Sequence, residues 1–283
     1  MCLVAACDAG EKTEPTLAPI PVAPKPVVVD GPNLAYLPAD ADVVFKIDVA
    51  RLRKSKLWPL YGQVFERSLV PGKSCEHSLD GASTVMVGMT VKHDASVLVF
   101  RGIDQQVLLG CLRQAGDATF DGNFATVKNP NTVDVLTFVD PHTMVVERAK
   151  QATRPSLQAH GAPDAALVAA LARLPANADI AIASRPGSPD LAEKWSAIGS
   201  HLEALTGTIV SADELKLELA MVLRTHDEAE RLATQAKAQL KSAMSMFDRV
   251  DAIAQDRTVT IDIALGEPKL KSLVAMLGGM ISQ

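Results

Sequence analysis

One sequence pattern occurs twice in this chain of 283 residues, and its period is as long as a domain. The segment Leu37 to Val43 (LPADADV) recurs from Leu174 to Ile180 (LPANADI), at an offset of 137 residues. The same offset relates the only two tryptophans, Trp58 and Trp195, and it also relates Gly62 to Gly199. A fixed offset that joins a turn, a tryptophan and a glycine predicts two similar halves rather than a solenoid of short repeats.

Each half shows the order strand, helix, strands, helix, strands. In the first half Val43, Phe45 and Ile47 alternate with other side chains, which is typical of a strand with one apolar face. In the second half the apolar side chains from Leu215 to Leu223 alternate with Lys216 and Glu218. The fold class that follows is α+β, and each half is expected to be an antiparallel sheet with helices packed on one face.

Helix signals stand between these strands. Asp104 is a predicted cap for a helix that Gly116 ends, and Thr225 with Glu228 forms a predicted capping box. Further strands are expected at 120–127, 132–139, 143–147 and 257–265, and a closing helix from Pro268.

The helix after the second LPA turn is predicted to begin at Ser188 as cap and Pro189 as first residue. Its expected apolar stripe is Leu191, Trp195, Ile198, Leu202 and Leu205. Trp58 and Trp195 are therefore expected to be equivalent core residues, each between the helix and the sheet of its own half.

The N-terminus resembles the end of a bacterial lipoprotein signal peptide. Val4-Ala5-Ala6-Cys7 is similar to a lipobox, and the chain changes abruptly from apolar to polar after Cys7. The resemblance implies that Cys7 carries the lipid. Because only six residues precede Cys7 and none is positively charged, we expect the true start codon to lie upstream.

Residues 8–36 contain six prolines and are predicted to form an extended, disordered tether, since this spacing forbids helix and removes sheet donors. An ordinary disordered tail is the alternative. The predicted organisation is a truncated signal remnant at 1–7, the tether at 8–36, an α+β half at 37–150, a connecting segment at 151–173 and an α+β half at 174–283.

The openings of the halves also resemble a group of proteins. Leu37 to Val44, Asp48 to Leu52 and Leu57-Trp58 look like segments of uncharacterised secreted proteins and lipoproteins from myxobacteria and their relatives. The resemblance implies export, and it implies no known activity.

Several classes of function find no support in the sequence. A net charge of −5 and 4% aromatic residues argue against nucleic acid as a partner. Gly72-Lys73-Ser74 matches the end of a P-loop, but Arg67 stands where its first glycine belongs. Ser200 and His201 fall within the expected helix, where adjacent side chains diverge and cannot pair as nucleophile and base. No catalytic, cofactor-binding or metal-binding residues are predicted.

Two further groups of polar residues have a simple structural interpretation. Asp40, Asp42 and Asp179 belong to turns that lead into strands, where short polar side chains satisfy exposed backbone donors. Cys75-Glu76-His77 holds ligand-type residues, but no second cluster completes a zinc site. The six histidines are scattered singly and are expected in solvated turns.

Two cysteines remain once the signal is removed and Cys7 is lipidated. An even pair is compatible with one disulfide in an oxidising compartment, so we expect a bond between Cys75 and Cys111. The alternative makes Cys111 only a small buried apolar side chain on its helix.

These observations lead to one main hypothesis of function. The chain is expected to be a lipid-anchored, extracytoplasmic protein of the bacterial cell envelope, attached to the membrane through Cys7 and without enzymatic activity. It would bind another envelope protein or a small apolar ligand. The alternatives are a hydrolase of envelope polymers, with acidic residues that converge between the halves, and a structural spacer. Buried, pKa-perturbed carboxylates in a cleft would favour the enzyme, and an apolar groove would favour binding.

Overall fold

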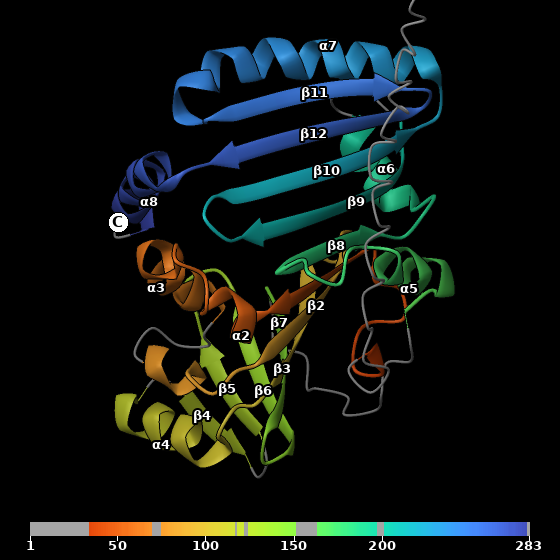
Figure 1. The fold of residues 1–283 in the computed structure, drawn as a ribbon. Helices are drawn as coiled ribbons and strands as arrows, with labels where there is room; N and C mark the ends of the chain where they lie inside the picture. The colour runs from red at the N-terminus through yellow and green to blue at the C-terminus, as the bar shows by residue number, and fades with distance from the viewer. Residues whose placement is uncertain are drawn as a thin grey trace, which may run out of the picture.

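The computed structural model describes residues 34–69, 75–116, 118–121, 124–150, 163–196 and 201–281. The predicted signal remnant with Cys7, nearly all of the tether, Gly199, Ser200 and most of the connecting segment lie outside these ranges. The tether was predicted to extend too far, because Leu34 and Tyr36 pack in a core with Leu37 and Val44. The described residues form one twelve-stranded sheet with helices packed against it (Figure 1). The fold class is α+β.

Neighbouring strands in this sheet are antiparallel throughout. Their order across the sheet is β11-β12-β10-β9-β8-β1-β2-β3-β7-β6-β5-β4. The first half contributes β1 (Val43–Asp48), β2 (Thr84–Thr90), β3 (Ala95–Arg101), β4 (Ala118–Asp121), β5 (Phe124–Lys128), β6 (Val133–Asp140) and β7 (Thr143–Ala149). The second contributes β8 (Ile180–Ser184), β9 (Leu202–Ser211), β10 (Leu215–Leu223), β11 (Arg249–Gln255) and β12 (Thr258–Leu265).

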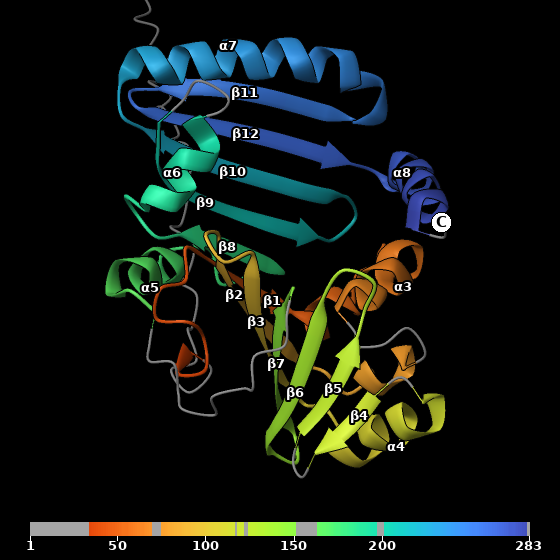
Figure 2. The same ribbon diagram turned by 180° about the vertical axis from the view of Figure 1, so that it is seen from behind.

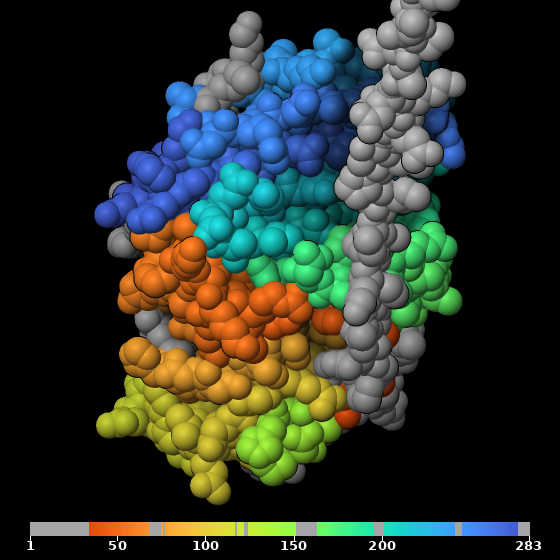
Figure 3. Space-filling view, viewed as in Figure 1, coloured from red at the N-terminus to blue at the C-terminus, as the bar shows by residue number. Residues whose placement is uncertain are grey.

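The two halves meet where β1 pairs with β8, with Phe45 opposite Ile182 and Ile47 opposite Ile180. From this seam the strands run outward as β1-β2-β3-β7-β6 on one side and β8-β9-β10-β12-β11 on the other. The first half adds the hairpin of β4 and β5 at its outer edge. The expectation of a separate sheet in each half was wrong, because hydrogen bonds between β1 and β8 join both into one. Figure 3 shows the two halves as adjoining parts of one surface.

The helices are α2 (Val49–Leu52), α3 (Trp58–Leu69), α4 (Gln105–Ala115), α5 (Ala165–Ala172), α6 (Pro189–Ser196), α7 (His226–Ala243) and α8 (Glu267–Ile281). The two faces of β1 show how they are distributed. Ile47 packs in a core with residues of α2 and α4, whereas Val44, three residues earlier in β1, packs in a second core with Leu167 and Leu171 of α5. Helices therefore cover both faces at the seam, and the expectation of a single covered face was incomplete. Figure 2 shows α7 along the outer edge of the second half and α5 beside β8.

The first-half core is built around Phe100, which is fully buried. Trp58 lies at its margin, partly buried, in edge-to-face contact with Tyr61 and Phe65. Its indole covers Gly62, where an added Cβ would lie 2.4 Å from Trp58 Cε2. This contact explains why a glycine follows this tryptophan by one helical turn. The side chain of Trp195 lies outside the described residues.

The structure confirms both helix caps and corrects several elements. Asp104 accepts hydrogen bonds from the N–H groups of Gln106 and Val107, and Thr225 accepts one from the N–H of Glu228. The helix expected from Pro189 to Leu205 was wrong, because α6 ends at Ser196 and residues 202–211 form β9. The single strand expected at 120–127 is the hairpin of β4 and β5, and β11 and α2 were not anticipated.

Candidate functional site

Two buried aspartates stand at matching places beside the seam. Asp42 precedes β1 and Asp179 precedes β8, and the two side chains are only about 2% exposed. The main-chain N–H of Arg185 donates to the carbonyl of Asp42 at 2.7 Å, and the N–H of Asp48 donates to the carbonyl of Asp179 at 2.8 Å. Each aspartate is thus bonded to a residue of the opposite half. Asp40, in contrast, is exposed.

The carboxylate of Asp42 is fully supplied with donors. It accepts hydrogen bonds from the N–H of Val91 at 2.8 Å, from Arg185 Nη2 at 2.7 Å and from Ser188 Oγ at 2.5 Å. Burial alone raises the pKa of Asp42, but the hydrogen bonds from Ser188, Val91 and Arg185 outweigh it and hold the pKa below its usual value. Asp42 is therefore a structural anion.

The carboxylate of Asp179 has fewer partners. It accepts a hydrogen bond from the N–H of Ser211 at 2.6 Å, and the guanidinium of Arg51 comes no closer than 3.9 Å. Burial raises the pKa of Asp179, and these two partners only partly offset the effect. Neither aspartate is accessible to a substrate. Both have a structural role, because each connects its own half to the other through hydrogen bonds.

Cys75 and Cys111 are joined by a disulfide in the structure, with Cα atoms 5.8 Å apart. This separation is compatible with the bond expected from the sequence. It ties the segment before β2 to α4, beside the first-half core. Cys75 is therefore not a metal ligand here. Within the described residues, no group of three or more His, Cys, Asp or Glu side chains is placed to hold a metal ion.

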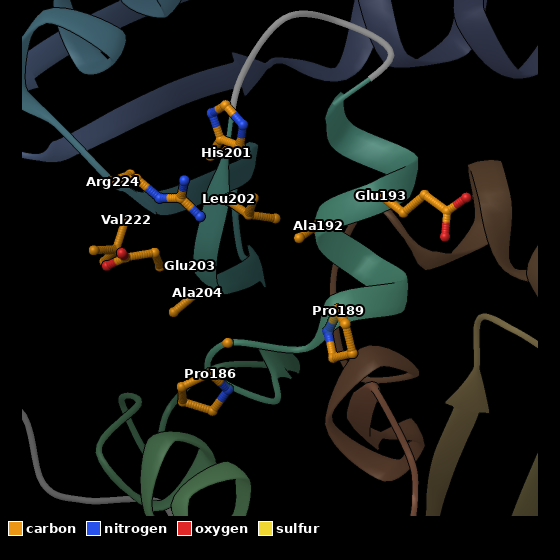
Figure 4. Close-up of a pocket in the computed structure, with 11 residues that line it drawn as sticks. Pro186, Pro189, Ala192, Glu193, His201, Leu202, Glu203, Ala204, Val222 and Arg224 are labelled. Carbon is orange, nitrogen blue, oxygen red and sulfur yellow. The ribbon is translucent and has the colours of Figure 1, made fainter.

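An open cavity of about 920 Å³ lies in the second half between α6 and the paired ends of β9 and β10 (Figure 4). Most of the residues that line it are apolar or glycine: Pro186, Gly187, Pro189, Ala192, Leu202, Ala204 and Val222. Sequence reasoning missed this site, since it had placed Leu202 and Leu205 on a helix. The signal that could have found β9 is the run Thr206 to Val210, which is rich in β-branched residues.

The floor of the cavity is the loop from Arg185 to Ser188, and Asp42 holds both of its ends through the hydrogen bonds described above. Ser188 also caps α6, because its Oγ accepts a hydrogen bond from the N–H of Leu191. Within the loop, the N–H of Gly187 donates to the carbonyl of Glu203 at 2.7 Å. Gly187 has φ +68°, a conformation that disfavours other residues. The cavity loop is thus fixed by the first half and by β9.

Charged side chains surround the cavity. Glu203 pairs with Arg257 at 3.1 Å, and His201 Nδ1 lies 2.7 Å from an oxygen of Glu228. The hydrogen bond from His201 holds the pKa of Glu228 below its usual value, against the effect of burial. The remaining charged lining residues are Glu193 and Arg224. The site offers an apolar cavity with a polar border.

A smaller cavity of about 190 Å³ lies between α8 and the turn before β11, lined by Ser245, Met246, Lys269, Ser272, Leu273 and Met276. Met246 and Met276 are 41% and 50% exposed. Its size is below the range of typical ligand sites, so the larger cavity is the candidate site.

Solved structures of TP0453 show the same fold. Crystal form I of TP0453 matches 88% of this chain and 98% of its own chain, with a TM-score of 0.57 and 13% sequence identity. Crystal form III matches 88% and 99% with a TM-score of 0.54 and 12% identity, and crystal form IV matches 87% and 96% with 0.53 and 10%. At these identities the likeness shows the fold alone.

No protein-family model matches the sequence, and no curated protein matches it. In the described part of the chain, none of the helices has the length and apolar character needed to cross a membrane.

Proposed function

We propose that this protein is a lipid-anchored, extracytoplasmic binding protein of the bacterial envelope, and that a small apolar ligand occupies the cavity between α6 and the β9–β10 pair. The observation that carries the proposal is the cavity itself. Its volume of about 920 Å³ lies at the upper end of the range of roughly 300–1,000 Å³ that is typical of small-molecule sites, and its lining is mainly apolar. An apolar cavity favours an apolar ligand because binding removes apolar surface from water.

Three features support export and anchoring. Cys7 follows a lipobox-like sequence, a proline-rich segment separates it from the folded part, and the disulfide of Cys75 with Cys111 suits an oxidising compartment. A lipid on Cys7 would hold the protein at the membrane while the tether allowed the folded part to reach its ligand.

We further propose that the two halves arose by duplication of one fold. The shared strand order around the seam supports this, as do Asp42 and Asp179 with their cross-bonded main chains. Duplication would explain how one half came to hold the floor of a cavity in the other.

The hydrolase alternative requires carboxylates that a substrate can reach. Asp42 and Asp179 lie at opposite ends of the β1–β8 pair, and both are buried and bound by protein donors. A binding role does not need such groups, and the apolar cavity favours it.

The binding proposal is tested with N-phenyl-1-naphthylamine, a neutral apolar fluorophore. We expect saturable fluorescence enhancement with the wild-type protein. Ala192→Phe, which directs a ring into the cavity, should abolish it. Ala238→Phe makes the same change at an exposed position of α7 outside the cavity lining and should retain it. Equal enhancement by all three proteins, or no saturable enhancement by the wild type, would overturn the proposal.

The anchoring proposal is tested by expression from the full upstream reading frame. The native protein should partition with membranes and carry lipid, and Cys7→Ala should carry none. A protein that keeps Met1 and remains in the cytosolic fraction would overturn this part.

A further inference from the structure

We infer that the ligand of the cavity is an amphiphile with a negatively charged headgroup on an alkyl chain, and that Arg224 receives the headgroup. This inference rests on the proposed function, because it names the chemical class of the ligand for the same site. It depends on which charges around the cavity already have partners.

The acidic side chains at the cavity are engaged or turned away. Glu203 is paired with Arg257, and Glu228 is paired with His201. Glu193 lines the cavity from α6, but in Figure 4 its carboxylate points away from β9 and β10. Within the described part of the chain, the guanidinium of Arg224 has no ion-pair partner. Among the described residues that line the cavity, Arg224 is therefore the cation that is available to an anion.

The position of Arg224 is well defined by its neighbours. It directly follows Leu223, which is fully buried, and its N–H donates to the carbonyl of His201 at 3.2 Å. The backbone is thus held at the border of the cavity while the side chain remains exposed. Figure 4 shows the guanidinium on the cavity side of the β9–β10 pair, toward Leu202 and α6.

This arrangement separates an apolar region from a cationic border. Ala192, Ala204 and Val222 supply surface that favours an alkyl chain. A guanidinium presents a planar fork of donors that matches carboxylate and phosphate oxygens. A carboxylate and a phosphate monoester both present anionic oxygens that can accept from this fork. The headgroup of a free fatty acid and that of a phosphorylated lipid are therefore both compatible with the site.

The experiment displaces bound N-phenyl-1-naphthylamine with three twelve-carbon amphiphiles below their critical micelle concentrations. The probes are dodecanoate, dodecyl phosphate and dodecyltrimethylammonium. We expect the two anions to displace the fluorophore at concentrations about five-fold lower than the cation, as one exposed ion pair would give. The ratio of the two anions then identifies the preferred headgroup.

Arg224→Gln should weaken displacement by the anions about five-fold and bring it near that of the cation. Lys128→Gln removes the same charge from an exposed residue of β5 in the first half and should leave the anion preference unchanged. Equal displacement by all three amphiphiles, or an anion preference that survives Arg224→Gln, would overturn this inference and leave the binding proposal intact. Failure of the fluorophore to bind the wild type would overturn both.

Discussion

Asp42 and Asp179 occupy matching positions in the two halves, yet only one of them is well supplied with donors. Asp42 accepts three hydrogen bonds and has a lowered pKa, whereas Asp179 accepts one from Ser211 and has a raised pKa. The main-chain pattern of the seam is therefore the same on both sides, whereas the side chains that neutralise the buried charges differ.

The segments that these aspartates hold differ in the same way. At the offset of 137 residues, Val49 and Leu52 of α2 correspond to Pro186 and Pro189. Val49 and Leu52 are buried in the first-half core, while Pro186 and Pro189 line the open cavity. Equivalent positions therefore fill a core in the first half and border the open cavity in the second.

Phe100→Ala should lower the free energy of unfolding by about 3–5 kcal/mol, because it leaves a large cavity in a filled core. Denaturant titration measures the loss. A cost below about 1 kcal/mol would mean that the first half is not the well-packed region described here.

Removal of the disulfide by Cys75→Ala with Cys111→Ala should cost roughly 3–4 kcal/mol, because the bond restricts a loop of about 37 residues in the unfolded chain. Binding of N-phenyl-1-naphthylamine should be unchanged below the unfolding transition, since the bond lies in the first half. Unaltered stability would show that the two thiols are not bonded in the native protein.

Asp42→Asn should cost about 1–3 kcal/mol at neutral pH, since buried donors lose a charged acceptor. A group with a lowered pKa contributes stability above its unfolded pKa and loses it as pH falls through the folded value. The cost of Asp42→Asn should therefore shrink in acid. Loosening of the cavity loop should also weaken fluorophore binding.

Asp179→Asn should cost less than Asp42→Asn at neutral pH, because an amide oxygen can still accept from Ser211 without a buried charge. With a raised pKa, the stability that Asp179 contributes is fully present below its unfolded pKa and is lost as pH rises through the folded value. Equal costs for the two variants across the pH range would remove the contrast between the aspartates.

Ala192→Phe should change the free energy of unfolding by less than about 0.5 kcal/mol, because the ring enters open space. Ala125→Phe makes the same change at a fully packed position of the first half and should cost about 1–3 kcal/mol. Similar costs at both positions would contradict the difference in packing.

Local sequence signals predicted most of the elements. Alternation of apolar and polar side chains predicted β1 and β10, and short polar caps predicted the beginnings of α4 and α7. The strand that was missed is β9. Its residues Leu202 and Leu205 lie at the spacing of a helical apolar stripe that begins at Leu191. Over only a few residues, such a spacing of apolar side chains is compatible with a helix and with a strand. What decides for a strand is tertiary pairing, seen in the close contact of Gly207 with Leu219 of β10.

No continuous sequence motif predicted the candidate site. Its lining comes from the β8–α6 loop, α6 and the ends of β9 and β10, and its floor is held by Asp42, more than 140 residues earlier. The turn LPADADV led to a correct structural interpretation of Asp42, but the partners Arg185 and Ser188 depend on the pairing of β1 with β8. These contacts form only when strands that are distant in the sequence pair, so no local sequence motif predicts them.

Methyl NMR with N-phenyl-1-naphthylamine shows whether the proposed ligand binds in the second-half cavity. We expect saturable shifts of the methyl resonances of Ala192, Leu202, Ala204 and Val222, while those of Met246 and Met276 at the small cavity by α8 remain in place. Shifts confined to Met246 and Met276, with the α6 and β9 methyls unmoved, would contradict it.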